Sequence, residues 1–107
     1  MNNKVIKTII YSGKYYGLKR SESSHNKIIM NQFGANLIKT LSDYDNLQKS
    51  GIYFLINEKE NNTEIYVGQA NCLYERLKQH NNDSEKEFNK VICFCKNLSS
   101  GFSSIFL

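Results

Sequence analysis

The chain has 107 residues, of which 40% are hydrophobic and 22% charged, and its net charge is +4. This composition predicts one globular domain, alone or with an appendage, with room for a modest core. No stretch approaches the roughly 20 apolar residues of a membrane-spanning helix, and the N-terminus lacks the apolar core of a signal peptide. These features exclude a membrane span and favour a cytoplasmic protein.

The positive charge lies in the first half of the chain. Residues 1–50 contain eight Lys and Arg against three acids, whereas residues 51–107 contain six against seven. A basic first half would attract a nucleic acid electrostatically. The alternative is an ordinary solvated surface, and charge alone does not decide between the two.

The three cysteines, Cys72, Cys93 and Cys95, are odd in number and accompany no secretion signal, so we expect free thiols. Their spacing does not provide the ligand pairs of a zinc site. Two thiols two residues apart on a strand point to the same face, so Cys93 and Cys95 are expected to be buried together.

In the first half, a hairpin and a helical segment are predicted in chain order. Residues 5–11 are β-branched and aromatic and predict a strand, and residues 15–19 are expected to return after a turn. Residues 27–30 predict a third short strand. Residues 34–49 follow helical spacing, with apolar side chains on one stripe. A boundary is inferred near residues 48–50, although no proline marks it.

The second half predicts a strand, a polar loop, a second strand, a helix and a third strand. Residues 51–56 are apolar on both alternating faces, so we expect a central strand covered on both sides. Residues 64–68 are expected to pair with this strand in antiparallel fashion. Residues 71–80 predict a helix and residues 91–95 the third strand.

The predicted helix combines a buried stripe with two basic side chains. At 100° per residue, Leu73 and Leu77 lie on one side, and Arg76 and His80 share a face at its edge. A guanidinium beside a buried stripe requires an acid or a bound anion as partner. Taken singly, Arg76 fits a surface salt bridge and His80 fits a cation at a helix C-terminus.

Together, these residues form a spaced pattern. Gly51-Ile52-Tyr53 is followed by Tyr66-Val67-Gly68 on the next strand, and then by Arg76 and His80 on the helix. This order and context resemble the GIY-YIG nuclease family, with YVG in place of YIG. The first half looks like the leader of a bacterial subgroup of that family.

The resemblance implies a fold and a division of the chain. The fold would be α+β, a small three-stranded antiparallel sheet flanked by helices and preceded by an N-terminal β-hairpin and helical segment. Residues 1–48 would form the basic leader, and residues 49–107 the nuclease core.

The resemblance also implies an activity, the hydrolysis of DNA phosphodiester bonds with Mg²⁺ or Mn²⁺, in repair, restriction or mobile-element biology. Tyr53 would take or relay a proton from the attacking water, and Tyr66 would orient the phosphate or the water. Arg76 would clamp the non-bridging oxygens, and His80 would bind phosphate or assist Tyr53.

Three further positions are expected to contact the substrate. Gly68 would let the backbone turn close to the DNA. Gln69 and Asn71 would bind the DNA backbone.

The chain also departs from the family. The family supplies its metal-binding glutamate from a helix well downstream of the arginine helix, but no acidic residue follows Glu87. No metal ligand is therefore identifiable, and we expect a C-terminally truncated or short divergent member with weak or no nuclease activity by itself. The alternatives are a catalytically silent nucleic-acid-binding module and a homo-oligomer whose partner covers the exposed face of the sheet.

Overall fold

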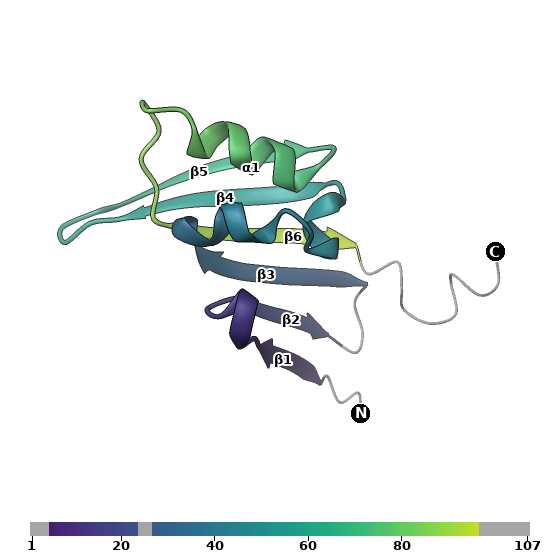
Figure 1. The fold of residues 1–107 in the computed structure, drawn as a ribbon. Coiled ribbons are helices and arrows are strands. Elements are labelled where there is room, and N and C mark those ends of the chain that lie inside the picture. Colours follow the sequence, from purple (N-terminus) through teal and green to yellow (C-terminus); the bar gives the residue numbers. More distant parts are fainter. Residues whose placement is uncertain (1–4, 24–26, 97–107) are drawn as a thin grey trace.

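The computed structural model describes residues 5–23 and 27–96. These residues form one antiparallel sheet of six strands in the order β1-β2-β3-β6-β4-β5. The helices lie on one face of this sheet, in front of it in Figure 1. The predicted α+β class is confirmed, and among the described residues no helix is long and apolar enough to cross a membrane.

The strands are β1 (Ile6–Ile10), β2 (Lys19–Ser23), β3 (Ile28–Gly34), β4 (Gly51–Glu58), β5 (Thr63–Ala70) and β6 (Lys90–Lys96). The helices are the α-helix α1 (Leu73–Asn81) and the 3₁₀ helices η1 (Gly13–Tyr15), η2 (Ala35–Leu41) and η3 (Asp45–Gln48).

The predicted hairpin is present, but its second strand begins at Lys19 rather than at Tyr15. The residues between the strands form η1 and a turn in which Gly13 and Gly17 have φ angles of 65° and 98°. Glycine adopts these left-handed conformations more readily than other residues do. The connection between β1 and β2 is therefore longer than the predicted turn. The helical segment predicted over residues 34–49 is present, as two 3₁₀ helices, η2 and η3, separated near Ser42 and Asp43.

The prediction of a separate three-stranded sheet is wrong, because the sheet includes the leader strands. Strand β6 lies between β3 and β4 and pairs with both of them, and its pairing with β3 runs from Ile28–Lys96 to Gly34–Lys90. This pairing joins segments about sixty residues apart, so local sequence patterns do not reveal it. The sheet therefore crosses the boundary predicted near residues 48–50.

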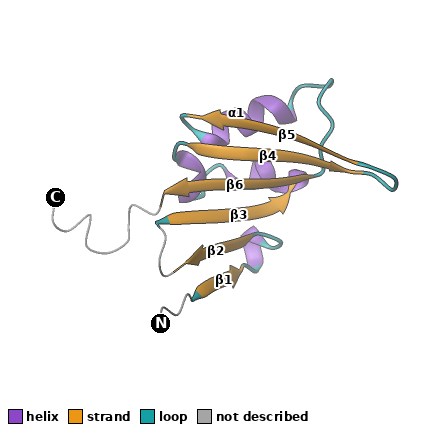
Figure 2. Ribbon diagram, turned by 180° about the vertical axis from the view of Figure 1, so that it is seen from behind, coloured by secondary structure: helices purple, strands orange, loops and turns teal. Residues whose placement is uncertain are grey.

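The two faces of the sheet have different environments, because the helices cover only one of them. The covered face carries Tyr53, Leu55 and Val91, which belong to the buried core. Figure 2 shows the other face, which we call the open face, with no helix in front of it. The prediction that β4 is covered on both sides is therefore wrong, since Ile52 is 46% exposed.

The open face is defined by the side chains that alternate with the core positions along the strands. Its apolar members are Ile6, Ile10, Ile28, Met30, Ile52, Phe54, Ile56, Ile65, Val67, Ile92 and Phe94.

The predicted state of the cysteines is confirmed. All three are free, and Cys93 and Cys95 are buried together on the covered face of β6. Burial raises the pKa of both thiols, so they stay protonated at neutral pH. Cys72 precedes α1 and is half-buried.

Candidate active site

The candidate site lies on the covered face, where α1 runs back along the edge strand β5. The predicted antiparallel pairing of β4 and β5 is confirmed, with Tyr53 opposite Gly68 and Leu55 opposite Tyr66. Both tyrosines therefore point to the same face of the sheet. Leu73 and Leu77 are fully buried and fix the helix against the sheet, as the sequence predicts.

Tyr53, Tyr66 and His80 form a compact cluster. The Tyr53 hydroxyl and Nε2 of His80 share a hydrogen bond of 2.8 Å. The two tyrosine rings are stacked with centroids 6.4 Å apart, and the His80 ring lies 5.4 Å from each of them. The structure thus brings together three of the four predicted catalytic side chains.

The two tyrosines differ in their access to solvent. Tyr53 is 1% exposed, whereas Tyr66 is 46% exposed. The buried hydroxyl of Tyr53 is therefore connected to solvent through its hydrogen bond to His80, which is half-buried. Any proton movement at Tyr53 involves the Tyr53–His80 pair as a unit.

Gly68 lies inside β5, so the expected turn at this position is wrong. A Cβ atom built on Gly68 would collide with the hydroxyl of Tyr53 and lie 2.5 Å from its Cζ. Glycine is therefore needed here because the Tyr53 ring packs against the backbone of the paired strand. This contact, rather than a turn, explains the glycine that faces Tyr53 across the strand pair.

The electrostatic surroundings keep His80 neutral. Burial lowers the pKa of His80 below its ordinary value, and the nearby charges of Lys86 and Arg76 lower it further. At pH 7 the imidazole is therefore predominantly uncharged, and it can accept a proton.

Arg76 lies one helical turn before His80 and is exposed. It lines a pocket of about 440 Å³ together with Gln69 and Asn71, at the end of β5. The structure thus places the two predicted DNA-contacting residues beside the predicted phosphate clamp. Among the described residues no carboxylate forms an ion pair with Arg76, so its guanidinium is available to an anion.

Lys86 also borders the tyrosine–histidine cluster, although the sequence gives no direct indication of this position. It lies in the loop between α1 and β6, and its Nζ atom is 3.7 Å from the centre of the Tyr66 ring. The helical pattern ends at Asn81, so no periodic pattern predicted where the side chain of Lys86 would lie. The one signal was Phe88, an apolar residue in a polar loop, which packs against the core and anchors the segment.

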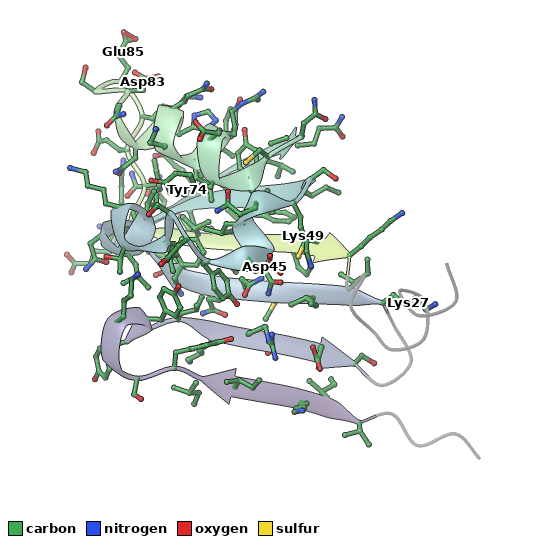
Figure 3. The ribbon with its side chains drawn as sticks, turned by 45° about the vertical axis from the view of Figure 1, so that its right-hand side comes forward. Lys27, Asp45, Lys49, Tyr74, Asp83 and Glu85 are labelled. Atoms are coloured by element: carbon green, nitrogen blue, oxygen red, sulfur yellow. The ribbon has the colours of Figure 1, made fainter. Side chains whose placement is uncertain are left out.

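The described residues do not fit a divalent metal ion at this cluster. In the described ranges no group of three or more His, Cys, Asp or Glu side chains could hold a metal. Figure 3 shows Asp83 and Glu85, which follow α1, at the tip of the loop. The cluster itself offers phenols, an imidazole and cations, whereas Mg²⁺ and Mn²⁺ prefer carboxylate oxygens.

Comparison with known proteins agrees with this geometry. Residues 49–100 match the family model described as the GIY-YIG catalytic domain. The comparisons with curated proteins and with solved structures each return no match. The match covers β4, β5 and α1, the elements that carry the tyrosine–histidine cluster, together with β6, and it supports the assignment of this segment to the GIY-YIG nuclease family.

Proposed function

We propose that the chain binds DNA along β5 and acts on a phosphodiester bond at the Tyr53–Tyr66–His80 cluster. The observation that carries this proposal is the 2.8 Å hydrogen bond between the Tyr53 hydroxyl and a neutral His80, with the free guanidinium of Arg76 one turn away. Hydrolysis of a phosphodiester needs a proton acceptor for the attacking water and positive charge around the phosphate. These side chains supply both.

Each residue has a defined task in this proposal. Arg76 holds the non-bridging oxygens of the phosphate, because a guanidinium matches two of these oxygens at once. The Tyr53–His80 pair accepts the proton of the attacking water, and Tyr66, which is exposed, orients that water or the phosphate. Gln69 and Asn71 hold the DNA backbone next to Arg76.

The divalent metal that the family implies has no ligand set among the described residues, and no step is assigned to it. Mg²⁺ or Mn²⁺ remains part of the proposal as a requirement to be tested. We expect the chain by itself to cleave DNA weakly for this reason, whereas binding of DNA needs only the cationic side chains.

Cleavage of supercoiled plasmid DNA with Mg²⁺ or Mn²⁺ tests this proposal. We expect slow nicking by the wild-type chain, and a loss of about 100-fold or more in Tyr53→Phe and in Arg76→Ala. Lys78→Ala is the matched control for Arg76→Ala, because Lys78 lies on the same helix but pairs with Glu75 at 3.8 Å.

The results separate the proposal from its alternative. Nicking that is equally fast in Tyr53→Phe, Arg76→Ala and the wild type would place the activity elsewhere. DNA binding without nicking in either metal would instead support the silent nucleic-acid-binding module. Rapid nicking that is lost in Tyr53→Phe would confirm the site and contradict the expectation of weak activity.

A second copy of this chain is our proposal for the occupant of the open face. Six of its side chains are at least 42% exposed, namely Ile6, Ile10, Ile28, Ile52, Ile65 and Val67. Together with the half-buried members, they form a largely apolar face of the sheet. Homodimer interfaces are about 65% apolar, so the same face of a second copy fits this composition.

Analytical ultracentrifugation tests the dimer. We expect the 12.4 kDa chain to sediment as a dimer, and the double variant Ile52→Lys/Val67→Lys to sediment as a folded monomer, because two buried ammonium groups would oppose association. Tyr16→Lys is the control, since Tyr16 is 77% exposed but lies in the turn after η1. A wild-type chain that stays monomeric at high concentration would overturn the proposal.

A further inference from the structure

We propose that Lys86 binds a second phosphate of the nucleic-acid backbone, on the opposite side of the tyrosine–histidine cluster from the phosphate held by Arg76. This inference rests on the proposed function and deepens it, because it gives the site two phosphate contacts along one DNA strand rather than a single contact.

The first argument is the position of the Lys86 ammonium group over the ring of Tyr66. Its Nζ atom lies 3.7 Å from the centre of the Tyr66 ring, and Tyr66 is half-exposed. Lys86 and Tyr66 line a pocket of about 160 Å³. Within the described part of the chain, Lys86 forms no ion pair, although Glu64, Glu85 and Glu87 line the same pocket.

The second argument is that the backbone holds Lys86 in place. The Lys86 N–H donates to the carbonyl oxygen of Asp83 at 3.0 Å, and the Asn89 N–H donates to the carbonyl oxygen of Ile56 at 2.8 Å. Between these bonds, Phe88 packs against the core. The first bond closes a turn within the loop, and Phe88 and Asn89 tie the loop to the core and to β4 just after Lys86, so its backbone is already held in place when the ammonium binds an anion.

The third argument is the order of the cations along β5. Arg76 lies with Gln69 near the C-terminal end of the strand, and Lys86 lies over Tyr66, three residues earlier. Three residues of a strand span about 10 Å. Successive nucleotides of one DNA strand are about 3.4 Å apart along the axis, so two cations at this separation meet different phosphates.

His80 lies near both cations, because its ring is 5.4 Å from the Tyr66 ring that Lys86 covers and Arg76 precedes it by one turn of α1. The charges of Lys86 and Arg76 both lower the pKa of His80. In this proposal, a backbone that contacts both cations passes close to the imidazole of His80.

Binding of a labelled DNA duplex in EDTA, followed by fluorescence anisotropy at several salt concentrations, tests this inference. In Lys86→Gln we expect weaker binding and a slope of log K against log salt that is smaller by about one, as for the loss of one phosphate contact. Lys86→Arg should keep the slope. Lys78→Gln is the matched control, because Lys78 also lies over a ring, that of Tyr74 at 5.7 Å, but away from the cluster.

The outcomes distinguish this inference from the proposed function. Equal binding and equal slopes in Lys86→Gln, Lys78→Gln and the wild type would overturn the role of Lys86 and leave the proposed function standing. A wild-type chain that does not bind DNA would overturn both. NMR titration of His80 checks that Lys86→Gln acts at the site, since its pKa should rise in this variant and stay unchanged in Lys78→Gln.

Discussion

Gly68→Ala is expected to displace Tyr53 from its hydrogen bond with His80. The added methyl group would collide with the Tyr53 hydroxyl, and Tyr53 is 1% exposed, so its ring has no free space into which to move. We expect the hydrogen bond to His80 to break, with a loss of about 1–3 kcal/mol in the free energy of unfolding. If Tyr53 has the role proposed for it, nicking should fall by about 100-fold, because a reacting group displaced by about 1 Å loses its alignment.

A double variant makes this prediction specific. Adding Tyr53→Phe to Gly68→Ala removes the hydroxyl that the new methyl group meets. Chemical denaturation should therefore show that the double variant loses less stability than the sum of the two single variants. Strictly additive losses would mean that Gly68 and Tyr53 do not contact each other as described.

Gly51→Ala is expected to have the largest effect on stability. Here the added Cβ would collide with the backbone carbonyl oxygen of Phe94 in β6, and it would lie 3.0 Å from Cδ1 of Leu73. A backbone atom in the middle of a paired sheet cannot turn aside as a side chain can. We expect a loss of about 3 kcal/mol or more in the free energy of unfolding, measured by urea denaturation.

Gly34→Ala is the matched control for this change. Gly34 also ends a strand beside β6, but the atom that its new Cβ would meet most closely is Oδ1 of Asn36, at 2.7 Å, on a side chain that can rotate. This variant should cost much less stability than Gly51→Ala. Similar losses in both variants would contradict the close approach of β4 and β6 at Gly51.

The two glycines of the signature thus have different physical tasks. Gly51 allows two backbones to pack, so its replacement should act on the whole fold. Gly68 allows the Tyr53 side chain to reach His80, so its replacement should act first on the site. Both tasks depend on the register in which Tyr53 faces Gly68.

Several features of this protein were determined by the sequence by itself. Alternation placed Cys93 and Cys95 on one face, and helical spacing placed Leu73 and Leu77 inward with His80 at their edge. The spacing of the Gly-Ile-Tyr and Tyr-Val-Gly segments identified the family that the match over residues 49–100 confirms. These predictions succeeded because each depends on the geometry of one element or of one hairpin.

Only the tertiary structure decided the rest. Local periodicity shows which side chains of a strand are apolar, but not which element covers them. The sequence therefore could not predict that Tyr53 is buried while its neighbour Ile52 is exposed. The six-stranded sheet depends on the pairing of β3 with β6 across the length of the chain. Lys86 reaches Tyr66 because its loop is tied to β4 and to the core, and contacts between segments so far apart have no period in the sequence.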